Sequence, residues 1–120
     1  RFVSACAFLN RNNSEFKQQP TEWMKVAMTR ERFRQRVLIR PQSEQLLNIN
    51  SELSMDYVGR FENIQASLDQ ILDHLLLPRI GLSLRNSSDH SQYHTYYDSA
   101  LKQQVSAFYQ QDLDMFGYGF

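Results

Sequence analysis

The apolar residues between positions 64 and 75 recur with the period of an α-helix, and this pattern constrains the fold more than any other feature of the sequence. They fall on one face of a helix. Asn63 precedes the pattern and can serve as an N-cap, whereas Pro78 follows it at a position where helices usually stop. The apolar face comprises Ile64, Leu68, Ile71, Leu72 and Leu75. The sequence therefore predicts an amphipathic helix that begins near Asn63.

Three other segments carry helical patterns. The first lies at the N-terminus. The second is expected to begin near Thr21, which can serve as its N-cap. The third is expected to begin near Asp98 and to end at Gly117. The expected apolar faces, in chain order, are Phe2, Cys6 and Leu9; Trp23, Val26, Ala27 and Phe33; and Leu101, Val105, Phe108 and Tyr109.

Residues 54–58 have the composition of a short strand, and Gly59 follows them directly. A glycine at this junction lets the chain turn from the strand into the next helix, where a Cβ would crowd the bend. Glu62 suits the positive end of that helix. Residues 43–53 are expected to form a polar loop or a short hairpin. The sequence thus predicts a mainly α fold with one or two short strands.

The composition is that of an ordinary globular domain. The chain has 120 residues, of which 42% are hydrophobic and 22% are charged, and its 13 basic residues balance 13 acidic ones. This balance gives no reason to expect nucleic acid as a partner. No apolar run approaches the ~20 residues that span a bilayer, so no membrane segment is expected. The single cysteine, Cys6, favours a reducing compartment such as a bacterial cytoplasm, with a Golgi lumen as the alternative.

Five short stretches resemble the motifs of one enzyme family. They are RFVSA (1–5), RPQ (40–42), DYVGRFENIQASL (56–68), RNSSDHSQYHTYYD (85–98) and QDLDMFGYGF (111–120). In their order and spacing they resemble the carbohydrate-type sulfotransferases. RFVSA is similar to the end of the family's R-x-P-x-x-R-x-V-S-A motif, RPQ to its H-x-R-P-Q loop, and the last stretch to its D-x-x-x-F-G-Y-x-F ending. Residues 10–37 match poorly, and Leu38 stands where the family pattern has a histidine.

The resemblance implies an enzyme that transfers a sulfuryl group from 3'-phosphoadenosine 5'-phosphosulfate (PAPS) to a hydroxyl, usually on a carbohydrate, without a metal. It also implies an α/β fold related to the P-loop nucleotide kinases, of which residues 1–120 would be the C-terminal portion. The phosphate-binding loop and the general base would lie in the N-terminal half, which would be this chain's partner in one fold. We therefore expect the 120-residue chain alone to be inactive.

The same resemblance points to individual site residues. Ser4 matches a serine that helps bind the 3'-phosphate of the donor, and a hydroxyl beside a guanidinium suits a phosphate dianion. The segment that holds the nucleotide in relatives corresponds here to Arg85, Asn86, Ser87 and Ser88. Arg40 either faces anions of the substrate or pairs with a neighbouring acid. Without the resemblance, Ser4 is more simply a polar residue on a helix surface, and residues 85–88 a solvated loop.

Two other groups of residues leave alternatives open. The first group is a basic run that comprises Arg30, Arg32, Arg34 and Arg36. Basic runs most often form a solvated face, but binding of an acidic or sulfated glycan is the functional alternative for this one. His90 and His94 have helical spacing, but no carboxylate or cysteine nearby completes a zinc site.

A second class of function is a helical interaction module that keeps the family scaffold without its chemistry.

Overall fold

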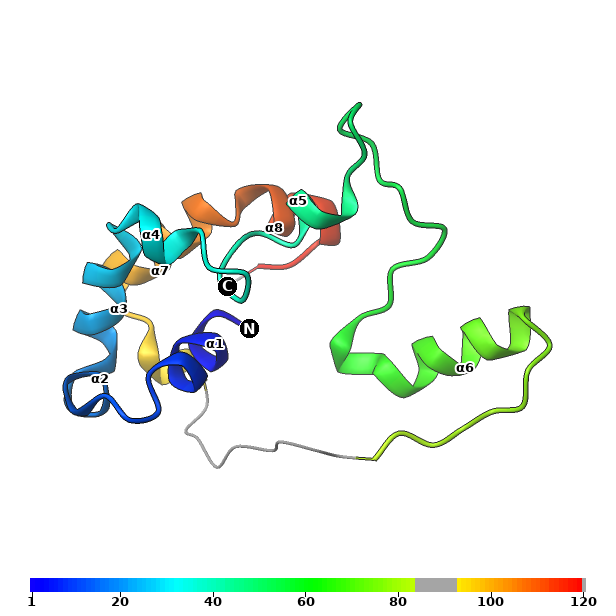
Figure 1. Cartoon of the computed structure of the whole chain (residues 1–120), viewed down its shortest axis with the longest axis horizontal. Helices are drawn as coiled ribbons and strands as arrows, with labels where there is room; N and C mark the ends of the chain where they lie inside the picture. Colours follow the sequence, from blue (N-terminus) through cyan, green and yellow to red (C-terminus); the bar gives the residue numbers. More distant parts are fainter. Residues whose placement is uncertain (84–92, 120) are drawn as a thin grey trace. The chain divides into compact units, whose positions relative to one another are not determined.

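The computed structural model describes residues 1–83 and 93–119, which are mainly helical, as the sequence predicts (Figure 1). The α-helices of the described residues are α1 (Phe2–Leu9), α2 (Ser14–Gln18), α3 (Pro20–Met28), α4 (Glu31–Arg34), α5 (Ser43–Leu46), α6 (Ile64–His74), α7 (Ser99–Phe108) and α8 (Gln110–Phe116). Two 3-10 helices, η1 (Phe61–Asn63) and η2 (Tyr93–Tyr96), accompany them. Extended pairing within the described residues is limited to isolated bridges at Leu47 and Leu53.

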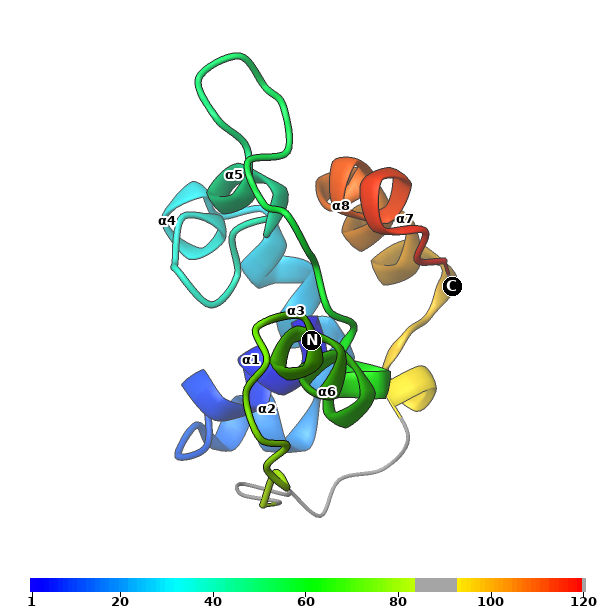
Figure 2. The same cartoon turned by 90° about the vertical axis from the view of Figure 1, so that its right-hand side faces the viewer.

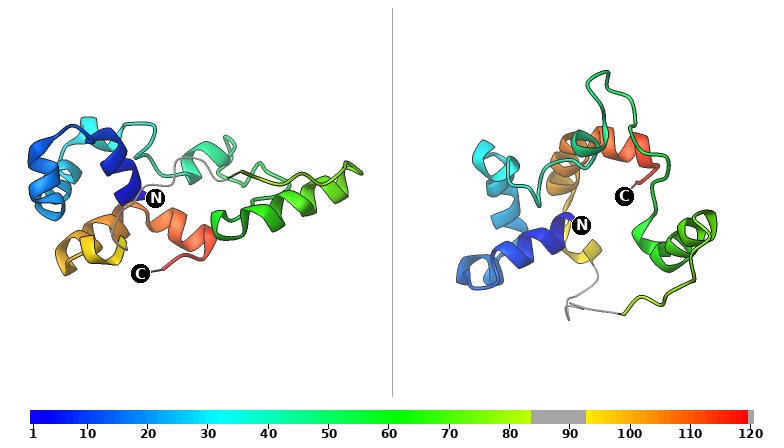
Figure 3. Two further views of the ribbon diagram at one scale, coloured as in Figure 1. Left: turned by 90° about the horizontal axis from the view of Figure 1, so that it is seen from below. Right: turned by 45° about the vertical axis from the view of Figure 1, so that its right-hand side comes forward.

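The chain forms two compact units. Residues 1–52 and 93–119 belong to the first unit, and residues 53–83 to the second. Within the first unit, α3 contacts α2, α4 and α7, while α8 contacts α5 and α7. Figure 2 shows α4 leading through irregular turns into α5, and Figure 3 shows α7 and α8 as successive helices along the end of the chain. The first unit contains most of the family-like motifs.

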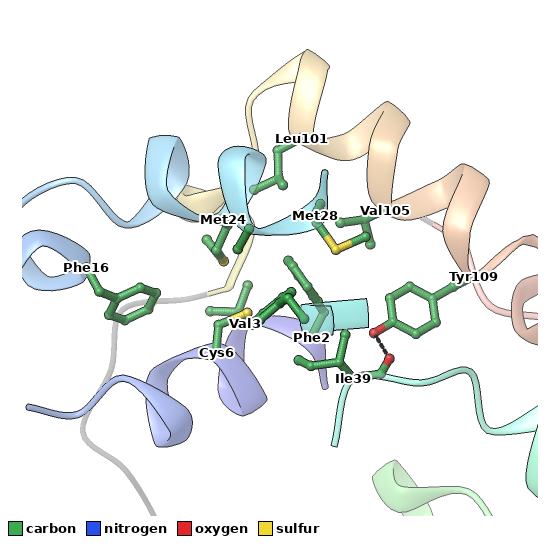
Figure 4. Close-up of a cluster of buried hydrophobic side chains, with 12 residues drawn as sticks. Phe2, Val3, Cys6, Phe16, Met24, Met28, Ile39, Leu101, Val105 and Tyr109 are labelled. Atoms are coloured by element: carbon green, nitrogen blue, oxygen red, sulfur yellow. Dashed lines mark hydrogen bonds between the residues drawn. The ribbon is translucent and has the colours of Figure 1, made fainter. Parts of the chain in front are cut away.

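The core of the first unit lies between α1, α3 and α7 (Figure 4). Met24 of α3, Leu101 of α7 and Cys6 of α1 are completely buried, and Ile39 joins them from the segment that precedes α5. The ring of Trp23 extends this core because it makes edge contacts with both Phe16, at 5.3 Å, and Phe33, at 5.6 Å. The helical pattern predicted at the N-terminus is confirmed, since Phe2 and Cys6 both face this core.

The start of α7 and the end of α8 agree with the helix start and stop that the sequence predicts. Asp98 is the N-cap of α7, and its carboxylate accepts a hydrogen bond from the Leu101 amide at 2.8 Å. Gly117 ends α8 with a φ of 64°, a left-handed conformation that glycine adopts without steric cost. The predicted helix is divided, however, because α7 ends at Phe108 and α8 begins at Gln110.

The prediction for the helix near Thr21 is wrong in two details. Pro20 occupies the first turn of α3, where its fixed φ suits a helix start, so Thr21 lies inside the helix. The Thr21 hydroxyl instead donates a hydrogen bond to the Tyr96 carbonyl at 2.9 Å. Val26 was expected in the core but is 51% exposed, because the buried face of α3 comprises Met24, Met28 and Ala27, of which Ala27 was predicted correctly.

The prediction of a strand at residues 54–58 is wrong. Residues 54–60 have no regular secondary structure, since a strand requires a neighbour to complete its hydrogen bonds and no described residue supplies one. The amphipathic helix is present as α6, although it follows η1 and the Asn63 side chain makes no capping hydrogen bond. The side-chain amide of Gln65 on α6 binds the segment that follows the helix. It donates to the Ile80 carbonyl at 3.0 Å and accepts from the Leu82 amide at 2.8 Å.

Gly59 lies against α6, which explains the glycine at the junction. A Cβ at this position would lie 2.9 Å from the Cβ of Ser67, closer than side-chain carbons normally approach. The sequence thus indicated correctly that a side chain would crowd the chain here, but the contact is with the following helix rather than within the bend.

We predict that Gly59→Ala loosens the second unit, whereas Gly81→Ala does not. A Cβ at Gly81 would meet no atom within 4 Å, so this variant is a matched control. Overpacking of this kind typically costs about 1–3 kcal/mol. Amide hydrogen exchange over α6 should therefore be faster in Gly59→Ala than in Gly81→Ala. Equal exchange in the two variants would show that the close approach is unimportant.

An ion pair joins α3 to the start of α7. The Lys25 ammonium lies 2.8 Å from Asp98 and 2.6 Å from Glu22. The Leu101 amide and then Lys25 hold the pKa of Asp98 below its usual value of 3.8. A carboxyl group whose pKa is lower in the folded state stabilises the fold above its unfolded pKa, and this stability is lost as the pH falls through the folded pKa.

The variant Asp98→Asn should therefore lose part of the acid sensitivity of folding. Asparagine is as good an N-cap as aspartate, so the cap is kept while the titrating charge is removed. Urea unfolding at neutral pH and at pH values below 3.8 would measure the effect. We expect a smaller loss of unfolding free energy on acidification in the variant than in the wild type. The same loss in both proteins would contradict this assignment.

Candidate functional site

The carboxylate of Asp112 connects two segments that are distant in the sequence. One oxygen accepts a hydrogen bond from the Gln42 amide and the other from the Ser43 amide, both at 2.8 Å. These amides lie at the N-terminus of α5, where backbone donors have no partners within the helix. Asp112 on α8 is therefore the cap of α5, supplied from another helix. Only 8% of its surface is exposed, so the hydrogen bonds compensate for the burial of its charge.

Arg1 brings the start of the chain to the same place. Its guanidinium donates a hydrogen bond to the Arg40 carbonyl at 3.2 Å and lies 4.0 Å from the Asp112 carboxylate. The pair is long and partly exposed, so its energetic contribution is small. Its position is more informative, because it places the first turn of α1 beside the segment that precedes α5.

Tyr109 anchors the other end of this segment. Its hydroxyl donates a hydrogen bond to the carbonyl of Ile39, which is completely buried (Figure 4). Burial raises the pKa of the Tyr109 phenol well above its usual range, so the group remains a hydrogen-bond donor. Residues 39–43 are thus held by side chains from the end of α7 and from α8.

Three of the five family-like stretches meet in this arrangement. Arg1 comes from RFVSA, Arg40 and Gln42 from RPQ, and Asp112 from QDLDMFGYGF. We refer to Arg1, Arg40, Gln42, Ser43 and Asp112 as the motif junction. Arg1 is 39 positions from Arg40, and Gln42 is 70 positions from Asp112, so the association of these segments results from tertiary structure.

Ser4 lies one helical turn after Arg1 on α1. The Ala5 amide bonds to the Arg1 carbonyl at 2.9 Å, which closes this first turn. Ser4 is exposed, and its hydroxyl makes no hydrogen bond to any described side chain or backbone group beyond its own helix. Its side chain can therefore donate to a ligand near Arg1. This position is compatible with the predicted contact to a phosphate.

Arg40 forms an ion pair, which was one of its two alternatives. Its Nε and Nη2 atoms donate to one oxygen of Glu44 at 2.9 and 2.6 Å. Both side chains are about 40% exposed, so water competes strongly with this pair. An anionic ligand can therefore displace Glu44 at modest cost. The contact of Arg40 with substrate stays a prediction.

The other predicted site residues cannot be placed. Arg85, Asn86, Ser87 and Ser88 lie outside the described residues, as does His90. His94 lies within η2 and stacks on the ring of Tyr93, with 3.8 Å between the ring centroids. In the described part of the chain, no three His, Cys, Asp or Glu side chains gather closely enough to hold a metal ion.

A pattern in the sequence indicates that position 112 is buried. The positions 101, 105, 109 and 112 continue one helical stripe, and the first three carry Leu101, Val105 and Tyr109. A carboxylate at the fourth position has to be either exposed or paired with buried donors. The sequence alone could not identify those donors, because they are backbone amides of a distant loop.

Cys6 is poorly suited to act as a nucleophile. Burial raises the pKa of the Cys6 thiol to about 12, so the thiolate is scarcely populated at neutral pH. Two shallow hollows occur on the first unit. One is lined by Gln110, Gln111, Asp114 and Met115, and the other by residues 8–13. Neither is lined by Ser4 or Arg40.

Comparisons with known proteins add no further constraint. No protein-family model, no curated protein and no solved structure matches this chain. Among the described helices, none is both long and apolar enough to cross a membrane.

We predict that Asp112→Asn destabilises the first unit, whereas Asp114→Asn is nearly neutral. The amide of asparagine offers only one acceptor to the two backbone donors, and a buried donor without a partner costs about 1–3 kcal/mol. Asp114 is exposed and accepts only from Gln110, so it serves as the control on the same helix. Urea unfolding should separate the two variants. Equal stability would show that Asp112 does not hold the fold together.

Proposed function

We propose that this chain is the C-terminal portion of a PAPS-dependent sulfotransferase that transfers a sulfuryl group to a hydroxyl of a carbohydrate. The observation that carries this proposal is the motif junction. Three stretches that resemble separate motifs of that family are joined by the hydrogen bonds of Arg1 and Asp112. The meeting of these stretches at one place in the first unit, although they are distant in the sequence, supports the proposal.

The residues near the junction suit the donor. PAPS supplies the sulfuryl group, and its 3'-phosphate is a dianion that needs hydrogen-bond donors and positive charge. The exposed hydroxyl of Ser4 and the guanidinium of Arg1 lie on successive turns at the start of α1 and provide both kinds of group. Their proposed role is to bind and orient the nucleotide.

Arg40 is the proposed contact to the acceptor. Sulfuryl transfer, like phosphoryl transfer, depends mainly on positioning and on charge stabilisation. The backbone around Arg40 is fixed by Tyr109 on one side and Asp112 on the other, so the residue starts from a defined position. Its guanidinium can exchange Glu44 for an anionic group of the acceptor.

Binding of adenosine 3',5'-bisphosphate tests the role of Ser4. We expect Ser4→Ala to weaken binding about tenfold, because a hydrogen bond to a charged group is worth about 1.5–3 kcal/mol. Ser14→Ala, at another exposed serine in the first unit, should leave the affinity unchanged. Calorimetric titration of the protein encoded by the complete gene would provide the affinities. An unchanged affinity in Ser4→Ala would contradict the proposed phosphate contact.

The coding sequence before Arg1 distinguishes the enzyme from an interaction module that keeps only the scaffold. A sulfotransferase requires a phosphate-binding loop for the 5'-phosphosulfate and a base near the acceptor hydroxyl. We expect the upstream codons to encode such a loop. A start codon immediately before Arg1 would instead favour the interaction module.

A further inference from the structure

In the ion pair between Arg40 and Glu44, one carboxylate oxygen accepts from two guanidinium nitrogens. Nε and Nη2 of Arg40 both donate to Oε2 of Glu44, at 2.9 and 2.6 Å. These two nitrogens form one edge of the guanidinium, and two oxygens of a single oxyanion can contact such an edge through parallel hydrogen bonds. Within residues 1–83 and 93–119, no second acid pairs with Arg40. Glu44 alone therefore occupies this edge of Arg40.

The backbone on both sides of the pair is held by the motif junction. The Arg40 carbonyl accepts from the Arg1 guanidinium at 3.2 Å. Ser43, which directly precedes Glu44, is completely buried, and its amide donates to Asp112 at 2.8 Å. The side chains of Arg40 and Glu44, by contrast, are about 40% exposed. Two exposed side chains thus extend from a held backbone, and their pair is formed before any ligand arrives.

The strength of the pair allows it to compete with a ligand and still be displaced. Exposed ion pairs favour the paired state only about 1.5- to fivefold, because water solvates both charges. An anion that needs the same edge of Arg40 can bind only the fraction of molecules in which Glu44 has left it. The apparent affinity for that anion is reduced by this fraction, so the pair weakens its binding about two- to sixfold.

We propose that Glu44 is an internal competitor at Arg40 for an oxyanion with two free oxygens, such as a sulfate or phosphate group. When no ligand is present, Glu44 occupies Nε and Nη2 of the guanidinium. When the oxyanion binds, it replaces Glu44 at these two nitrogens, and the carboxylate returns to water. Glu44 therefore sets how tightly an anion must bind before it occupies Arg40. The inference rests on the proposed function in one respect, namely that Arg40 contacts a ligand.

The test uses inorganic sulfate as the probe and the Nε–Hε NMR signal of Arg40 as the readout. Loss of the signal in Arg40→Gln assigns it. Sulfate titrations at constant ionic strength compare the wild type with Glu44→Gln and Glu15→Gln. Glu15 is an exposed glutamate on α2 that takes no part in the Arg40 pair, so Glu15→Gln removes the same charge and serves as the matched control.

We expect Glu44→Gln to bind sulfate at least about twofold more tightly than the wild type, whereas Glu15→Gln should bind it as the wild type does. Slow exchange of the Gln42 and Ser43 amides in Glu44→Gln would show that α5 is intact. Unchanged affinity in Glu44→Gln, an equal gain in both variants, or no sulfate binding at Arg40 in any of the three proteins would overturn the proposal.

A second measurement needs no variant. In the wild type, the ¹³C signal of the Glu44 carboxylate should shift in step with the Arg40 signal as sulfate is added, because the ligand displaces the carboxylate. A Glu44 signal that stays constant while sulfate binds Arg40 would show that the two do not compete, and would overturn the proposal.

The nucleotide titration separates this inference from the proposed function. Suppose that adenosine 3',5'-bisphosphate binds the protein encoded by the complete gene and that Ser4→Ala weakens this binding, while Glu44→Gln leaves the sulfate affinity unchanged. Only the present inference would then fail. Tighter sulfate binding in Glu44→Gln without any nucleotide binding would instead support the internal competitor and contradict the sulfotransferase.

Discussion

The buried carboxylate of Asp112 is the interaction on which the arrangement of the first unit depends. A charge removed from water has to be paired or hydrogen-bonded, and Asp112 meets this requirement with two backbone amides at 2.8 Å. The same two bonds satisfy the start of α5, which would otherwise lack a cap. Because Arg1 reaches both Asp112 and the Arg40 carbonyl, one acidic side chain organises the beginning, the middle and the end of the chain.

Local features of the fold could be predicted from the sequence, whereas long-range partners could not. The helix α6, the cap at Asp98 and the stop at Gly117 depend on neighbouring residues, and the structure contains all three. Thr21 was expected to act locally but bonds to Tyr96, which is 75 positions away. Residues 54–58 have strand-forming composition but no partner strand among the described residues. In each failure a tertiary contact, or the lack of one, outweighed local preference.

In the candidate site, too, local features could be predicted from the sequence and long-range partners could not. Ser4 and Arg40 could be selected from the sequence because they occur in stretches that resemble a known family. The contact of Arg1 with the Arg40 carbonyl could not be predicted, and neither could the hydrogen bonds of Asp112, whose partners are backbone amides without a sequence signature. The structure also resolves the alternatives for Arg40 only in part. The guanidinium is paired with Glu44, yet the pair is exposed enough to be replaced by a ligand.

The most direct test of this account is amide hydrogen exchange at Gln42 and Ser43, measured by NMR. If Asp112 caps α5, these two amides are hydrogen-bonded and should exchange as slowly as amides in the interior of α3 or α7. Their protection should depend on the side chain at position 112, although that residue is about 70 positions away. Exchange as fast as that of exposed amides that have no hydrogen-bond partner would contradict the account, because the three motif-like stretches would then not be joined.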